Sequence, residues 1–259
     1  MTHSIRLLFI LSILALNLSA DPILSSWFTE HSGQYARIYE TVADESALNP
    51  VTTWSHPNNG SGQALPTYAG VHEIAYTEAN VYIRTSGLGF HVMGPWYLNE
   101  ERTNLFPNYP SNTSAIFRFP RVPGAPPISK TATGNGTIGY FVDGIGMFDS
   151  RDAFSYITSE GTDARPGRED RYRGDGIWNR DAYINESVTF DSAHAHQADI
   201  NHHYHANPPA LRHLIGDSVD YDALTNTYTE NFNGQHSPIM AWVRDGYPIY
   251  GPYGYDDPD

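Results

Sequence analysis

The sequence contains no cysteine and little positive charge. Without cysteine there are no disulfides, and a metal site has to use nitrogen and oxygen ligands, which excludes iron–sulfur clusters and thiolate zinc sites. Fifteen Lys and Arg stand against 29 Asp and Glu, for a formal net charge of −14. Such a chain repels phosphate backbones and anionic membranes, so we expect no nucleic-acid partner.

Long apolar runs are also missing, except for one near the N-terminus. Residues 7–18 are apolar, follow His3 and Arg6, and precede Ser19-Ala20. This pattern predicts a signal peptide over residues 1–20 with cleavage after Ala20, although an uncleaved membrane anchor is the alternative. We therefore expect a secreted or periplasmic protein with no transmembrane segment in the mature chain.

The common catalytic signatures are absent too. The chain has no G-x-S-x-G elbow, no phosphate-binding loop, no dinucleotide-binding fingerprint and no H-E-x-x-H helix. No serine hydrolase, nucleotide-binding enzyme or zincin is therefore indicated by a local motif.

What the chain does have is aromatic residues and turn formers. Aromatics make up 13%, with 22 Gly and 18 Pro, a composition that favours strands over helices. Alternating segments predict strands at 71–76 and 81–85, at 115–119, at 137–148 around Asp143-Gly144, and at 239–251 around Asp245-Gly246. A short helix is expected within 44–50, and loops at 55–66 and 159–181. We expect an all-β or β-rich α+β fold of antiparallel, sandwich-like sheets with long loops and few short helices, as a single domain over 21–259.

Histidines are concentrated in one segment. Two H-x-H pairs, His194/His196 and His203/His205, lie within residues 191–209. Residues two apart on a strand share a face, and residues 197–202 can fold the chain back, so up to four imidazoles would meet. His202 and Tyr204 would face the other way. Neutral imidazoles suit Zn, Cu, Ni or Fe.

Further ligands are expected from elsewhere in the chain. Asp191 and His236 are candidates, as ligands or as outer-shell partners, and a carboxylate could act as a general base. His91 has apolar neighbours and is expected to be a core histidine. The alternatives to a metal site are a hydrogen-bonded His/Tyr network and an exposed His-rich loop.

The residues 178–217, with DSAHAHQADINHHYH at their centre, and the run HSPIMAWVRDGYPIYGPYGYDDP resemble the YHYH-domain family. The resemblance is strongest over 138–256 and implies an exported protein of unsettled function. By position, Asp191, His196, His203 and His205 match the family pattern, as do residues of the 245–252 hairpin. Family members commonly continue past this hairpin, which predicts that the sequence is truncated at Asp259.

The sequence departs from that pattern at several positions. His202 stands where the first Tyr of the name motif is expected, and Ala195 and Ala241 replace glycines. His194 matches no family position, so His196, His203 and His205 form the expected core of the site. The change at His202 leaves the ligand face intact, because it alters the opposite side of the strand.

Two functions follow from these patterns. The first is an exported metal-binding protein, an enzyme or a metal carrier, holding a divalent transition metal, with Cu or Zn favoured, and acting on a small molecule. The second is a non-catalytic module that binds carbohydrate or another extracellular polymer and uses the histidines as a structural network. Its candidate aromatics are Trp54, Trp96, Tyr97, Trp178, Trp242, Tyr247, Tyr250 and Tyr253.

Overall fold

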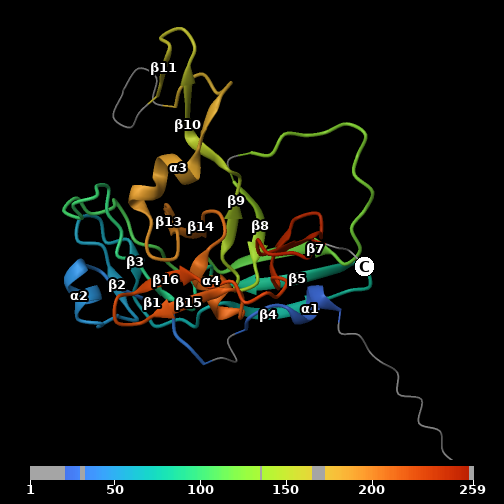
Figure 1. Ribbon diagram of the computed structural model, residues 1–259, viewed down its shortest axis with the longest axis horizontal. Helices are drawn as coiled ribbons and strands as arrows, with labels where there is room; N and C mark the ends of the chain where they lie inside the picture. Colours follow the sequence, from blue (N-terminus) through green and yellow to red (C-terminus); the bar gives the residue numbers. More distant parts are fainter. Residues whose placement is uncertain (1–20, 30–32, 135, 165–172, 257–259) are drawn as a thin grey trace, which may run out of the picture.

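The computed structural model describes residues 21–29, 33–134, 136–164 and 173–256 (Figure 1). The predicted signal peptide and part of the predicted loop at 159–181 lie outside these residues. None of the helices in the described ranges has the length and apolar character needed to span a bilayer.

The largest sheet has six strands in the order β13-β14-β9-β8-β17-β18. Its strands are β8 (Thr137–Phe141), β9 (Gly146–Phe148), β13 (Ala195–Ala198), β14 (Asn201–Tyr204), β17 (Ile239–Val243) and β18 (Pro248–Tyr250). All neighbours are antiparallel except β14 and β9, which run parallel with His203 opposite Gly146. The histidine-rich segment therefore forms the edge hairpin of the central sheet.

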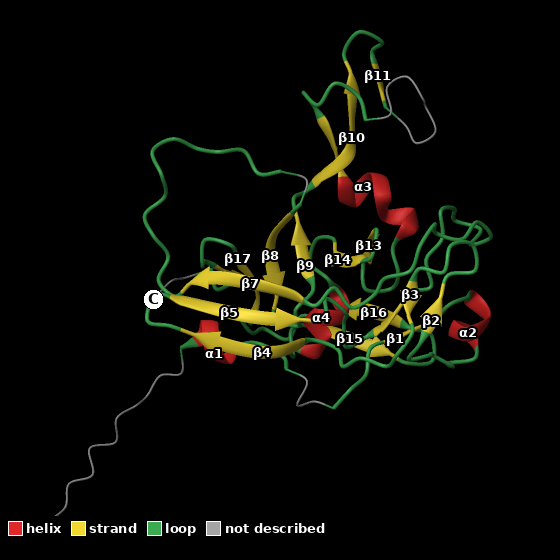
Figure 2. Ribbon diagram, turned by 180° about the vertical axis from the view of Figure 1, so that it is seen from behind, coloured by secondary structure: helices red, strands yellow, loops and turns green. Residues whose placement is uncertain are grey.

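A second sheet has three antiparallel strands, β4 (Val71–Tyr76), β5 (Asn80–Thr85) and β7 (Ala115–Pro120). Its strands cross those of the large sheet at a steep angle (Figure 2). Side chains from both sheets share one core, with Ile83 and Phe119 from the small sheet and Phe141, Tyr204 and Trp242 from the large one. The β-rich, sandwich-like fold is thus confirmed.

A second cluster of buried residues fills the region before β7. It includes Leu88, Phe90, Met93, Trp96 and Phe106. The short strands in this region are β1 (Arg37–Ile38), β6 (Val92–Met93), β2 (Trp54–Ser55) and β3 (Gly62–Gln63). Trp96 joins this cluster to the hairpin, since its indole N–H donates to the Ala195 carbonyl at 2.9 Å.

An arm extends from the body at β10 (Arg151–Ile157), β11 (Thr162–Asp163) and β12 (Asn179–Asp181) (Figures 1 and 2). The chain returns from it through α3 (Ala182–Glu186) and the 3-10 turn η2 (Ser187–Thr189). The Asp181 side chain caps α3 by accepting from the Ile184 N–H at 3.0 Å. This return path brings α3 beside the hairpin.

The remaining elements are short. They are α1 (Pro22–Ser25), α2 (Val42–Ser46), α4 (Pro209–Leu214) and the hairpin of β15 (Val219–Asp222) with β16 (Thr227–Glu230). Prolines at the start of α1 and α4 suit a first helical turn, where no backbone N–H is needed.

The predicted turns and strands are confirmed in detail. Gly144 and Gly246 adopt φ of 84° and 88°, as Asp-Gly turns between paired strands require. The predicted helix at 44–50 starts too late, because Thr41 and Asp44 form a capping box that begins α2 at Val42. The predicted loops at 55–66 and 159–181 contain the short strands β3, β11 and β12. A two-residue strand leaves no periodic signal in a sequence.

Replacing one isoleucine in β5 and one in β7 by alanine should distinguish the buried face of the small sheet from its exposed face. Ile83 is fully buried, whereas Ile116 is 67% exposed. Ile83→Ala should lower the free energy of unfolding by about 2–5 kcal/mol through lost burial and a cavity. Ile116→Ala should change it by no more than about 0.5 kcal/mol. Urea unfolding measures both, and equal losses would contradict this assignment of faces.

Candidate metal centre

The site is built on the β13–β14 hairpin. The strands pair with His196 opposite His203, and Gln197 opposite His202. Asp199 in the connecting turn has φ of 56°, a conformation that Asp tolerates better than most residues. The prediction that residues 197–202 turn the chain back is therefore confirmed.

Three imidazoles converge on one face of this hairpin. The Nε2 atom of His205 lies 3.1 Å from Nε2 of His196 and 3.1 Å from Nε2 of His203. The three residues are at most 8% exposed. His203 and His205 share a face because they are two residues apart, and His196 faces them across the strand pair.

The other ring nitrogens define the tautomers of two of these histidines. Nδ1 of His203 lies 3.1 Å from the Asn201 carbonyl, which can only accept, so Nδ1 carries the proton. The Thr189 hydroxyl donates to the Glu186 carbonyl at 2.6 Å and hence accepts from Nδ1–H of His196, also at 2.6 Å. In its neutral form each ring therefore presents an unprotonated Nε2 to the shared centre.

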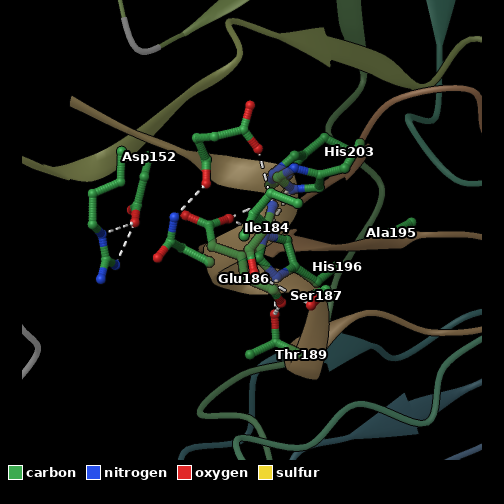
Figure 3. Close-up of polar contacts among 12 residues, drawn as sticks. Asp152, Ile184, Glu186, Ser187, Thr189, Ala195, His196 and His203 are labelled. Atoms are coloured by element: carbon green, nitrogen blue, oxygen red, sulfur yellow. Dashed lines mark hydrogen bonds and ion pairs between the residues drawn. The ribbon is translucent and has the colours of Figure 1, made fainter.

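Glu186 supplies a carboxylate to the same point. Its Oε2 lies 3.3 Å from Nε2 of His196 and 3.6 Å from Nε2 of His205. Figure 3 shows Glu186 and Thr189 directed from the α3–η2 segment toward His196. Burial raises the pKa of Glu186, a proton on Nε2 of His196 would lower it in part, and Asp152 raises it further.

Glu186 was not among the residues predicted from the sequence. It lies ten positions before His196 with no motif spacing, and only the return of α3 over the hairpin brings it to the histidines. A glutamate at the end of a short capped helix gives no local signal of a ligand.

Aromatic rings enclose the cluster. Phe148 stacks on His203 at 4.1 Å between centroids and Phe190 on His205 at 4.3 Å. Burial lowers the pKa of His205 to about 3 and that of His203 well below its usual value, and the neighbouring imidazoles add to both effects. These histidines are therefore neutral near pH 7, the form that binds metals.

This arrangement has a clear chemical consequence. Lone pairs on neighbouring Nε2 atoms repel one another unless a proton or a cation lies between them. A proton on Nε2 of His205 could bridge the other two rings, and a metal ion could bind all three nitrogens. The group His196, His203 and His205 has the donor types and proximity to hold a metal ion.

A cavity of about 450 Å³ adjoins the cluster. His205 forms part of its wall, together with Phe148, Asp181, Tyr183 and Met240. The Glu186 side chain is 22% exposed, so the centre is not sealed. The volume falls in the range of small-molecule sites.

Three of the residues predicted as ligands lie elsewhere. His194 precedes β13 with φ of 59°, which takes it out of the strand alternation, and its ring packs edge-on against Tyr183. His236 is exposed, donates from Nδ1 to the Ser237 carbonyl at 2.6 Å, and packs between Tyr250 and Tyr255. The four-imidazole arrangement is thus corrected to three.

Asp191 is the third predicted ligand that lies outside the first cluster. It belongs to a second group on the other side of the hairpin. That group consists of His91, Asp191 and His202. The prediction that His202 and Tyr204 face away from the first cluster is confirmed, since neither belongs to it. His91, expected to be a core histidine with satisfied hydrogen bonds, has an Nε2 without a hydrogen-bond partner in the ranges that the structure describes.

The aromatic residues proposed for polymer binding are divided between core and surface. Trp54, Trp96, Tyr97 and Trp242 are buried, and Tyr253 is half-buried. Trp178, Tyr247 and Tyr250 are exposed, at 71%, 44% and 46%. Trp178 lies beside β12 in the arm, whereas Tyr247 and Tyr250 lie at β18, so these three do not share one element.

Acid should destabilise the metal-free protein. The pKa of His202 and of His205 is lowered to about 3, mainly by burial, and that of His203 is also lowered. Because the unfolded histidines titrate near 6.5, the unfolded state binds more protons below that pH. The free energy of unfolding should then decrease as the pH is lowered below about 6.5, by up to about 1.4 kcal/mol per pH unit for each histidine.

Asp143 opposes this trend only in part. Burial raises its pKa to about 6, so the folded state binds its proton first. Urea unfolding in the presence of a chelator, at about pH 7 and about pH 5, measures the net slope. A stability that stays constant or rises on acidification would contradict the burial of three neutral histidines.

Comparison with known proteins agrees with the residue pattern. The family model described as YHYH protein matches residues 116–259, more than half of the chain. No curated protein and no solved structure matches. The match includes β7, the whole central sheet, α3 and the three clustered histidines, but not His91. The chain therefore belongs to the YHYH protein family.

Proposed function

We propose that this protein binds one divalent transition metal ion, zinc or copper, through Nε2 of His196, His203 and His205. The observation that carries the proposal is the contact of three Nε2 atoms at 3.1 Å, with Nδ1 of His196 and of His203 already hydrogen-bonded elsewhere. Hydrogen-bonding of the second nitrogen is the usual way in which proteins orient a ligating imidazole.

Glu186 is proposed as the fourth group of the centre, on the side open to solvent. Its carboxylate offsets the positive charge of an ion in a largely apolar surrounding. Because burial raises its pKa, Oε2 is also better suited than an exposed carboxylate to accept and return a proton.

The cavity beside His205 favours an enzyme over a simple carrier. A bound ion would supply Lewis-acid chemistry to a small polar molecule there. The chain's own residues provide an apolar wall at Phe148 and Met240 and polar groups at Asp181 and Tyr183. With the predicted signal peptide, this amounts to a metal-dependent enzyme that acts outside the cytoplasm.

Removing two of the three ligands should remove the metal. The chain from Asp21 onward, purified without a His-tag, should carry close to one equivalent of zinc or copper at the centre after loading. His203→Ala/His205→Ala should lose that equivalent, because one imidazole and one carboxylate hold such ions weakly. Elemental mass spectrometry measures the content of both proteins.

His236→Ala is the matched control, since it removes an exposed histidine outside both groups. It should keep the parent's metal content. No difference in metal content between the parent and the double variant would overturn the proposal.

Glu186 is tested by affinity rather than stoichiometry. Glu186→Gln keeps the size of the side chain but removes its charge, and should weaken metal binding about 10- to 100-fold. Competition with a chromophoric chelator measures the dissociation constant. Glu78→Gln, in the exposed turn between β4 and β5, should leave it unchanged. Equal affinities in both variants would exclude Glu186 from the centre.

A further inference from the structure

The opposite face of the hairpin carries a second convergent group. One ligand atom each from His91, Asp191 and His202 can be chosen so that all lie within 4.8 Å of one another. His202 comes from β14, Asp191 from the segment before β13, and His91 from a segment a hundred residues earlier. None of the three belongs to the first cluster.

His202 is the strongest sign that something is bound here. It is 2% exposed, and neither ring nitrogen has a hydrogen-bond partner among the described residues. An imidazole always has at least one N–H donor, so its burial without a partner costs free energy. Its ring neighbours are His91 at 5.8 Å and Trp96 at 5.7 Å between centroids. One of its ring nitrogens lies within 4.8 Å of a carboxylate oxygen of Asp191 and of a ring nitrogen of His91.

His91 is oriented toward the same point. The Tyr204 hydroxyl donates to Oδ2 of Asp143 at 2.8 Å, so it accepts from Nδ1–H of His91 at 3.2 Å. In the neutral ring the unprotonated Nε2 then faces Oδ2 of Asp191 at 3.7 Å and has no hydrogen-bond partner within the described part of the chain. A lone pair and a carboxylate face each other favourably only with a cation between them, or with a second proton on His91.

Asp191 is rigidly held. Its Oδ1 accepts from the backbone N–H groups of Ala193 and Ala195 at 2.9 and 3.2 Å, and its Oδ2 from Gly94 at 2.9 Å. Its side chain has no exposed surface, and that of His91 is 4% exposed. The carboxylate is thus fixed in position with one oxygen directed at His91.

We propose that His91, Asp191 and His202 form a second metal site, for a divalent ion such as zinc, independent of the first. Two imidazoles and one carboxylate are a common ligand set for such ions, and Tyr204 with Asp143 orients His91 from the outer shell. Because the three ligand side chains are almost fully buried, we assign the ion a structural role. It ties the segment at His91, which precedes the family match, to the edge hairpin.

His202 makes this second site a property of this chain rather than of the name motif. The motif has tyrosine at that position, and a neutral phenol is a poor ligand. His202→Tyr therefore removes the ligand with a residue that the motif itself uses. It should leave the first site intact, because residue 202 lies on the other face of the strand.

The experiment counts metal equivalents in the chain from Asp21 onward. Cobalt(II) is titrated into the metal-free protein and followed by its visible absorption, and zinc content is measured by elemental mass spectrometry. We expect two equivalents in the parent, one in His202→Tyr and one in His203→Ala/His205→Ala. His213→Tyr, which changes an exposed histidine of α4 in the same way, should keep two.

The two proposals fail in different ways. One equivalent in the parent that survives in His202→Tyr but not in the double variant overturns the second site alone. One equivalent that survives in the double variant but not in His202→Tyr supports the second site and overturns the first. If His202→Tyr does not fold, the parent and the double variant decide. Two equivalents in the parent and one in the double variant support the second site, whereas one equivalent in the parent and none in the double variant overturn it.

Discussion

The register between β13 and β14 is the constraint on which the rest of the site depends. With His196 opposite His203, one face of the hairpin presents three imidazoles and the other presents His202 and Tyr204. A slip of one residue would exchange the faces and separate both groups. The register is held from outside the hairpin, since Trp96 bonds the Ala195 carbonyl and Asp191 binds the Ala195 N–H. Parallel pairing with β9 then fixes the hairpin to the central sheet.

Burial keeps these histidines in the neutral form that binds metal ions, and it also costs solvation free energy. Five imidazoles lie in or beside the hairpin with side chains nearly inaccessible to water. Burial favours the neutral form of His203 and His205, and the hydrogen bonds at Nδ1 of His196 and His203 direct Nε2 inward. Proteins keep such arrangements where a ligand or a network compensates the loss of solvation. Among the described residues, no hydrogen bond compensates this loss at either ring nitrogen of His202 or at Nε2 of His91.

The two groups differ in their access to solvent. The first borders a cavity and receives a partly exposed carboxylate from α3, so its surroundings allow exchange of an ion or a small molecule. In the second, the side chains of His91, Asp191 and His202 are almost fully buried, although Asp191 borders another cavity of about 450 Å³, and the ligands come from distant parts of the chain. A site with a partly exposed carboxylate beside one with buried ligands suits one ion that reacts and another that holds the fold together. Both groups take ligands from the same strand pair, β13 and β14.

The sequence by itself determined the strands, the Asp-Gly turns, the hairpin and the face shared by His196, His203 and His205, because alternation and turn chemistry are local properties. It also indicated the family through the motif at 202–205 and the run after His236. Only the tertiary structure decided the other members. Glu186 reaches the histidines through the path of α3, and Asp191 turns away to bind backbone N–H groups. His91 lies in the segment between Phe90 and Met93, which belong to the second core cluster. Contacts between such distant segments depend on how sheets and loops pack together, and no spacing along the chain encodes them.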